Sequence, residues 1–130
     1  ELLVRRWRGR AQVSEASFLP RGRHLLVDFH GVAAGLLSDC STIEALLRDA
    51  ARAAGATPVG GEFHHFGPGL GVTGVLLLQE SHISIHTWPE HGFAAVDVFM
   101  CGAAQPGQAV AVIETALRPA SVTRQEAQRG

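Results

Sequence analysis

Residues 82–100 read HISIHTWPEHGFAAVDVFM and contain two runs of β-branched and aromatic residues around a short break. Apolar and polar residues alternate on both sides of the break, which predicts strands over 82–88 and 93–100. The break from Pro89 to Gly92 has the composition of a turn. The two strands should therefore form a hairpin.

More strands are expected on both sides of this hairpin. Between His24 and His30 every second residue is apolar, which is the pattern of a half-buried strand. Strand-like stretches follow near 57–66 and 72–79, and a short final strand is expected around Val122.

Two helices are predicted between these strands. Ser41 and Glu44 have the spacing of a capping box, and an apolar face then repeats at helical spacing until Gly55 ends the run. Pro106 opens a second helix that continues to about Leu117. The order strand, helix, four strands, helix, strand predicts an α+β fold. We expect a two-layer sandwich, with a mainly antiparallel sheet and two helices on one face.

The length of 130 residues suits one domain, placed at 22–130, with 1–21 as an N-terminal extension of unassigned role. A hydrophobic fraction of 46% and a net charge of −1 are typical of an ordinary globular protein. No apolar run approaches the roughly 18 residues that span a bilayer, and no apolar segment follows the N-terminal arginines as in a secretory signal. Two cysteines are too few for a disulfide framework, so we expect a cytoplasmic protein.

The chain contains no lysine, and all eleven of its Lys and Arg residues are arginines. An enzyme that uses pyridoxal phosphate needs a lysine for the internal Schiff base, so this class is excluded. Any carbanion chemistry on an amino acid must draw its electron sink from another group.

Reactive side chains concentrate between residues 64 and 101, where five of the seven histidines lie. His82 and His86 have a spacing that would suit a zinc ion on a helix, but on a strand four residues span about 13 Å, which disfavours a shared metal. A Ser–His hydrolase is also disfavoured, because Ser81 does not lie in a G-x-S-x-G motif. No metal site is therefore expected.

The run ESHISIHTWPE at 80–90, continuing through AAVDVF at 94–99 to Cys101-Gly102, resembles the signature of the prokaryotic S-adenosylmethionine decarboxylase proenzyme family, which is pyruvoyl-dependent. Further family positions are matched at Gly22–Leu25, Gly55–Thr57, Phe63-His64, Phe66 and Gly71–Val75. The resemblance thus covers about residues 22–125.

This resemblance implies that the chain cuts itself between Glu80 and Ser81. The Ser81 hydroxyl would attack the preceding carbonyl to give an ester, and elimination and hydrolysis would leave a pyruvoyl group. His86 is implied as the base of that elimination. Thr73, where the family often has Ser, is implied as the hydroxyl that holds the ester. The products would be a β chain of residues 1–80 and an α chain of residues 81–130.

The resemblance also implies the roles in the decarboxylation that follows. The pyruvoyl cofactor from Ser81 would form a Schiff base with the substrate amine and withdraw the electrons released with carbon dioxide. Cys101 is implied as the proton donor, and an ordinary thiol pKa of about 8.5 leaves it protonated. Glu90 would hold the ribose hydroxyls of S-adenosylmethionine, and Phe66 would stack on its adenine. The product would supply spermidine synthesis.

Two rival interpretations stay open. A relative with the same machinery would decarboxylate arginine or ornithine, and a non-catalytic subunit would keep the scaffold without cleaving. The presence of Glu80, Ser81, His86 and Cys101 together disfavours the second. The family also implies a homodimer with sites near its interface. No nucleic-acid or membrane partner is expected, because the N-terminal arginines have the pattern of a solvated extension.

Overall fold

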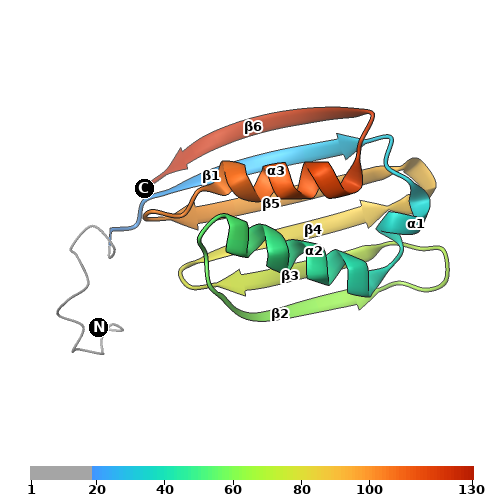
Figure 1. Ribbon diagram of the computed structural model, residues 1–130, viewed down its shortest axis with the longest axis horizontal. Coiled ribbons are helices and arrows are strands. Elements are labelled where there is room, and N and C mark those ends of the chain that lie inside the picture. Colours follow the sequence, from blue (N-terminus) through green and yellow to red (C-terminus); the bar gives the residue numbers. More distant parts are fainter. Residues whose placement is uncertain (1–18) are drawn as a thin grey trace.

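The computed structural model describes residues 19–130, so most of the N-terminal extension proposed at 1–21 lies outside the described residues. The described strands form one six-stranded sheet in the order β2-β3-β4-β5-β1-β6, and helices α2 and α3 lie side by side across one face of it (Figure 1). Every strand pair is antiparallel. The strands are β1 (Gly22–His30), β2 (Pro58–His65), β3 (Val72–Leu78), β4 (Ser81–Trp88), β5 (Phe93–Cys101) and β6 (Ser121–Arg129). The helices are α1 (Ala34–Leu37), α2 (Cys40–Ala53), the 3₁₀ turn η2 (Pro89–His91) and α3 (Pro106–Leu117).

The two-layer α+β sandwich predicted from the sequence is confirmed. The central hairpin is present as β4 and β5, which pair from Trp88 opposite Phe93 to His82 opposite Phe99. Gly92 ends the η2 turn with a φ of 60°, a left-handed conformation that glycine adopts without steric cost.

The last strand is longer than the short strand expected around Val122. It runs for nine residues and pairs with β1 along its whole length, from Ser121 opposite His30 to Arg129 opposite Gly22. Its residues are polar and almost all exposed, so they carry no alternating pattern. Backbone pairing to β1 therefore fixes this edge strand, which a hydrophobic pattern could not have indicated.

The predicted capping box at Ser41 and Glu44 is wrong. The N-cap of α2 is Asp39, whose carboxylate accepts a hydrogen bond from the Thr42 backbone N–H at 3.2 Å. Aspartate is as good an N-cap as serine, and it lies two residues earlier. Glu44 instead forms an ion pair with Arg48 one turn later, at 2.9 Å.

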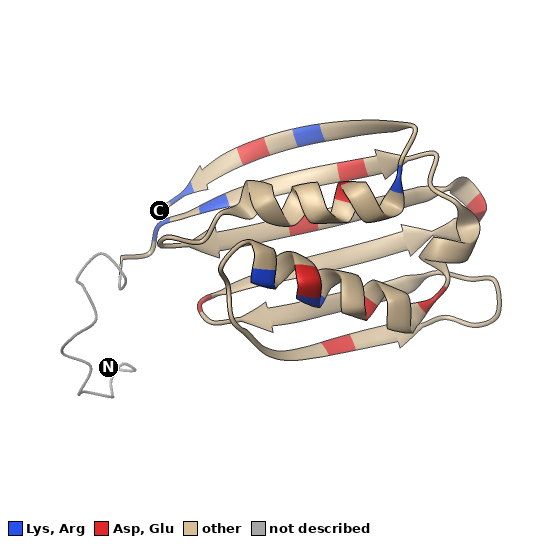
Figure 2. Ribbon diagram, viewed as in Figure 1, with Lys and Arg blue, Asp and Glu red and all other residues tan. Residues whose placement is uncertain are grey.

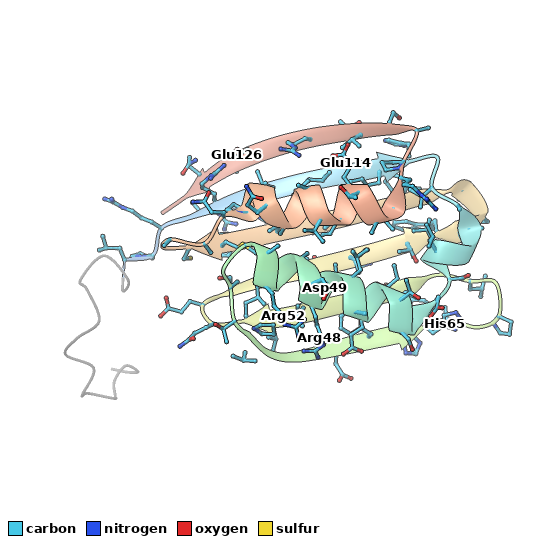
Figure 3. The ribbon with its side chains drawn as sticks, in the orientation of Figure 1. Arg48, Asp49, Arg52, His65, Glu114 and Glu126 are labelled. Atoms are coloured by element: carbon cyan, nitrogen blue, oxygen red, sulfur yellow. The ribbon has the colours of Figure 1, made fainter. Side chains whose placement is uncertain are left out.

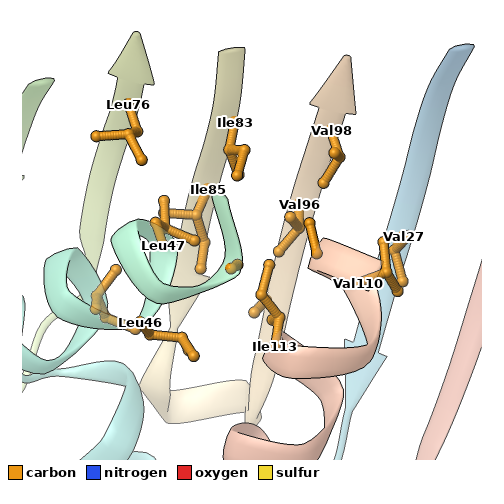
Figure 4. Packing of buried hydrophobic residues seen from close by; sticks show 14 of the residues in the cluster. Val27, Leu46, Leu47, Leu76, Ile83, Ile85, Val96, Val98, Val110 and Ile113 are labelled. Carbon is orange, nitrogen blue, oxygen red and sulfur yellow. The ribbon is translucent and has the colours of Figure 1, made fainter. Parts of the chain in front are cut away.

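The core lies between the helices and the face of the sheet that they cover. Apolar side chains from α2 and α3 interdigitate with those of β1, β3, β4 and β5 (Figure 4). The pattern Ile83, Ile85 and Thr87 on β4 is buried, whereas the alternate residues of the strand point to the other face. This alternation fixes the register of β4, because a shift by one residue would turn every apolar side chain out of the core.

The helix layer and the opposite face of the sheet present different side chains to solvent. The solvent side of α2 carries ion pairs such as Arg48 with Glu44 and Arg52 with Asp49 (Figures 2 and 3). No described helix covers the opposite face of the sheet, here called the open face (Figure 1). The open face carries Thr73, Val75 and Leu77 of β3, His82, Ser84, His86 and Trp88 of β4, Phe93, Asp97 and Phe99 of β5, and His24 and Leu26 of β1. None of the helices formed by residues 19–130 is long and apolar enough to cross a membrane.

Thr87 is the buried polar side chain that ties β4 to its neighbours. Its hydroxyl donates to the Leu37 carbonyl at 2.7 Å and accepts from the Val72 N–H at 2.8 Å. Thr87→Val keeps the shape and loses both bonds, so we expect the free energy of unfolding to fall by about 1–3 kcal/mol. Urea unfolding measures this change, with Thr57→Val, at an exposed position, as the matched control. Equal losses in the two variants would show that the Thr87 hydroxyl does not stabilise the fold.

Candidate active site

The predicted cleavage bond lies in the tight connection between β3 and β4. Leu78 pairs with Ser81, so Gln79 and Glu80 alone form the loop of this hairpin. Glu80 has a φ of 63°, which is uncommon for a residue with a side chain. The Ser81 hydroxyl donates to the Gln79 carbonyl oxygen at 3.3 Å and is thereby folded back along the turn.

A hollow of about 600 Å³ opens beside this turn and is here called the cleavage-site hollow. Glu80 and His82, the neighbours of Ser81 on both sides, line it, together with Cys101 at the end of β5. The other lining residues are Leu19, Pro20, Phe99, Arg129 and Gly130. The structure thus brings three residues predicted from the sequence, Glu80, Ser81 and Cys101, to one end of the sheet.

The Cys101 thiol is held in its protonated form. Burial raises its pKa, and the nearby negative charge of Glu80 raises it further. A protonated thiol can give its hydrogen to a carbanion, whereas a thiolate cannot. The surroundings of Cys101 therefore suit the predicted role of proton donor.

A second hollow, of about 310 Å³, lies at the other end of the hairpin and is here called the Glu90 hollow. It contains the other four predicted site residues, which are Phe66, Thr73, His86 and Glu90. Thr73 lies opposite His86 in the β3–β4 register, and its Oγ1 is hydrogen-bonded to His86 Nδ1 at 3.1 Å. Two residues that were predicted separately, one as a base and one as a processing hydroxyl, are thus in direct contact.

Trp88 also lines the Glu90 hollow and was not among the predicted site residues. Its ring is stacked in a tilted arrangement against Phe93 at 5.4 Å and lies 6.1 Å from the His86 ring. It stays 40% exposed, although tryptophan is usually well buried. A large aromatic ring that stays exposed to solvent beside a carboxylate is a feature of ligand-binding sites. Its place two residues after His86 was the signal in the sequence.

The structure does not bring His86 to Ser81 within one chain. The two residues are five positions apart on the extended strand β4, which at about 3.3 Å per residue separates them by roughly 16 Å. A base must come within hydrogen-bond reach of the proton that it removes. The cleavage-site hollow and the Glu90 hollow of one chain are therefore separate.

Polar and aromatic side chains on the open face connect the two hollows. The Ser84 hydroxyl donates to Asp97 at 3.1 Å, and His24 Nε2 lies 3.5 Å from the same carboxylate. The His24 ring meets His82 edge to face, with 6.1 Å between their centroids. His24 was not among the predicted site residues, and its strand position offered no chemical signal. Among residues 19–130, no three His, Cys, Asp or Glu side chains are grouped to hold a metal ion.

Protonation of His82 opposes folding. Its pKa is lowered by burial first and by the neighbouring His24 second, while Asp97 acts in the opposite direction. A folded pKa below the unfolded value of about 6.5 means that the unfolded chain binds more protons as the pH falls through this range. Stability contributed by neutral His82 is therefore present above about pH 6.5 and is lost towards the lower folded pKa. Thermal unfolding between pH 7.5 and 5.5 should show a smaller loss of Tm for His82→Asn than for the unaltered chain; equal losses would contradict this assignment.

The described domain has relatives in sequence and in structure. A family model described as S-adenosylmethionine decarboxylase matches residues 23–130. The S-adenosylmethionine decarboxylase proenzyme of Sulfurihydrogenibium sp. (strain YO3AOP1) is 43% identical over 110 residues, which cover 84% of this chain and 82% of that protein. The proenzyme of the same name from Methanococcus maripaludis is 44% identical over 110 residues, covering 84% of this chain and 89% of that protein.

A solved structure shares the same architecture. The crystal structure of the adenosylmethionine decarboxylase from Aquifex aeolicus VF5 aligns with a TM-score of 0.79 at 41% identity, over 85% of this chain and 92% of that chain. The family resemblance inferred from the motif at 80–102 is therefore confirmed over nearly the whole described domain.

Proposed function

The chain belongs to the S-adenosylmethionine decarboxylase family, and on this premise we propose that it cleaves itself between Glu80 and Ser81 and then decarboxylates S-adenosylmethionine. The observation that carries the proposal is the end of the sheet where the scissile bond lies beside a hollow lined by Glu80 and by the protonated Cys101. This arrangement offers a nucleophile for self-cleavage and an acid for the later reaction in one place.

Self-cleavage begins with the Ser81 hydroxyl, which already lies folded back along the turn. Its oxygen attacks the Glu80 carbonyl carbon, the bond from that carbon to the Ser81 nitrogen breaks, and the hydroxyl proton passes to the nitrogen. Removal of the Ser81 α-proton then breaks the bond between Ser81 Cβ and the ester oxygen. Glu80 leaves with a new main-chain carboxylate, which keeps the former hydroxyl oxygen of Ser81. Hydrolysis of the remaining enamine releases ammonia. The 81–130 fragment is left with a pyruvoyl group at its start.

The residues around Ser81 fit this group, because the flanking Glu80 and His82 both line a hollow that is open to a small molecule. When formed, a pyruvoyl carbonyl supplies the electron sink that pyridoxal phosphate supplies in other decarboxylases. Cys101 holds the proton that replaces the departing carboxyl group, since burial and Glu80 keep its thiol protonated. Glu80 also adds negative charge to a site for a cationic sulfonium substrate.

We propose further that two chains form a homodimer through their open faces. A two-fold axis lying across the strands turns the second sheet end over end, so the cleavage-site hollow of one chain meets the Glu90 hollow of the other. His86 of the partner subunit then reaches Ser81, whereas the His86 on the same strand as Ser81 lies roughly 16 Å from it. The exposed apolar side chains of Leu26, Leu77 and Trp88 support this packing, because removing their surface from water would stabilise the dimer.

The Glu90 hollow supports a nucleoside substrate over a basic amino acid. Phe66 and Trp88 offer two aromatic rings for a planar base, and the Glu90 carboxylate can accept hydrogen bonds from both ribose hydroxyls. Ornithine has no planar group and no ribose, and the planar guanidinium of arginine would cover less of the two rings than a nucleobase does. The reaction product would supply the aminopropyl group for spermidine. A reducing cytoplasm suits the chemistry, because Cys101 must stay a free thiol.

A substrate panel tests the proposed activity. Purified protein is incubated with S-adenosylmethionine, arginine or ornithine, each labelled in its carboxyl group, and the released carbon dioxide is counted. We expect turnover of S-adenosylmethionine and little or none of the two amino acids. Turnover of only arginine or ornithine would replace the substrate but keep the mechanism.

Glu90 gives the sharper test of nucleoside recognition. Glu90→Ala removes charge-assisted hydrogen bonds worth about 1.5–3 kcal/mol, so kcat/KM for S-adenosylmethionine should fall by roughly 10–100-fold. Self-cleavage should still occur, since Glu90 takes no part in it. Glu114→Ala, at an exposed position on α3 (Figure 3), is the matched control and should behave as the unaltered enzyme. An unchanged kcat/KM in Glu90→Ala would contradict the assignment of the ribose to this hollow.

A further inference from the structure

Two residues with side chains have a left-handed backbone among residues 19–130, Glu80 with a φ of 63° and Arg118 with a φ of 47°. Arg118 has an ordinary reason for it. It is the C-cap of α3, and its N–H donates to the Glu114 carbonyl to close the last turn of the helix. Helices often end on such a residue. Glu80 lies at no helix end, so its conformation needs another explanation.

The turn at Glu80 is also an unfavourable one for its place. Gln79 and Glu80 form a two-residue hairpin loop in which only the second residue has a positive φ. This sign pattern is that of a type II turn, which favours glycine at its second position and splays the two strands. Tight hairpins prefer the mirror-image turns, with Asn-Gly or Asp-Gly. Glutamate carries the steric cost that glycine would avoid.

The strain falls on the bond that the proposed function breaks. In the left-handed conformation the Cβ of a residue crowds its own carbonyl oxygen, and here that carbonyl is the one attacked by Ser81. The register Leu77 opposite His82 and Leu78 opposite Ser81 holds both ends of the loop. The loop therefore cannot relax while the peptide bond is intact.

We propose that Glu80 is a positioning residue for self-cleavage, and that it acts through the left-handed conformation that its Cβ disfavours. The inference rests on the proposed self-cleavage. In the first step, the bond between the Ser81 oxygen and the Glu80 carbonyl carbon forms, the bond from this carbon to the Ser81 nitrogen breaks, and the hydroxyl proton moves to that nitrogen. Breaking the amide bond places the Ser81 side chain in the link between the two residues, and this longer ester link lets Glu80 leave the disfavoured conformation, so strain release favours the forward direction.

The test compares the cleavage rates of Glu80→Gly and Glu80→Ala. Both variants lack the carboxylate, and only glycine also removes the Cβ. The full chains are made by cell-free synthesis, synthesis is stopped, and the uncut fraction is followed by denaturing mass spectrometry. Glu80→Gly should cleave about tenfold more slowly than Glu80→Ala, which corresponds to ~1.4 kcal/mol of activation free energy. Glu80→Asn should fall between them, because asparagine tolerates this conformation better than alanine does.

Arg118→Gly is the matched control, since it relieves the same kind of conformation far from the cut, and its cleavage rate should equal that of the unaltered chain. A second measurement does not depend on cleavage: in uncut Ser81→Ala protein, adding Glu80→Gly should raise Tm, and adding Glu80→Ala should not. Equal cleavage rates for the glycine and alanine variants, or a faster glycine variant, would overturn this inference while leaving the proposed function intact. An unaltered chain that never cleaves would overturn both.

Discussion

Ser81→Ala is expected to yield one uncut chain with no measurable decarboxylation of S-adenosylmethionine. The alanine side chain has no oxygen to attack the Glu80 carbonyl, and without the cut no keto group forms. The chain also has no lysine whose amine could form a Schiff base with a carbonyl compound in place of that group. The loss should therefore reach the background rate, several orders of magnitude below the unaltered enzyme. Denaturing mass spectrometry and carbon dioxide release measure the two effects.

Two controls separate this result from misfolding. Among residues 19–130 the Ser81 hydroxyl makes one hydrogen bond, at 3.3 Å, so the variant should keep the Tm of an intact fold. Ser41→Ala, at an exposed position on α2, should cut and turn over normally. A Ser81→Ala protein that still released carbon dioxide would show that the reaction does not use a group made from Ser81.

The second large effect is a rescue between two inactive variants. His86→Ala alone should stay uncut, and Cys101→Ala alone should cut but lose about 10²–10⁴-fold in decarboxylation for want of a proton donor. The proposed homodimer predicts that the two chains form mixed dimers when they are coexpressed. One site of each mixed dimer then joins the intact Ser81 and Cys101 of one chain to the intact His86 of the other.

With random pairing in the proposed homodimer, half of the dimers are mixed and one of the two sites in each mixed dimer is complete. A quarter of all sites is then active, so activity should return to about a quarter of the level of the unaltered enzyme. Mass spectrometry gives a second readout, because the His86→Ala chain, which stays uncut when expressed alone, should be cut in the mixture. Two copies of the same variant, expressed at the same level, are the control. Absence of both rescue and cutting would contradict a site shared across the open faces and place His86 in a different role.

The sequence predicted those parts of the fold that bury an apolar pattern. The alternation in β4 and β5 and the helical spacing in α2 and α3 report directly on which side chains leave water. The sequence did not predict the start of α2 correctly, since Asp39 and Ser41 are both good caps and only the surrounding packing selects one. The length of β6 was underestimated because an exposed edge strand held by backbone pairing has no such pattern.

The candidate site residues were proposed from the resemblance, which did not predict their arrangement in space. Thr73 and His86 come together because antiparallel pairing places them opposite each other. Ser81 and His86 are close in sequence, yet the extended strand that brings His86 to Thr73 also carries it away from Ser81. His24 was not predicted because a lone ring on a strand has the same appearance in sequence whether it lines a hollow or packs beside one. Trp88 was not predicted although its place two residues after His86 was a signal.

The mass of the denatured, freshly purified protein tests the central claim most directly. Self-cleavage predicts two fragments separated between Glu80 and Ser81, with the fragment that starts at position 81 lighter than its serine-terminated form by the difference between a pyruvoyl group and a serine residue. It also predicts that this fragment resists amino-terminal sequencing, since a keto group has replaced its amine. A single intact chain that stays uncut on prolonged incubation would contradict the account.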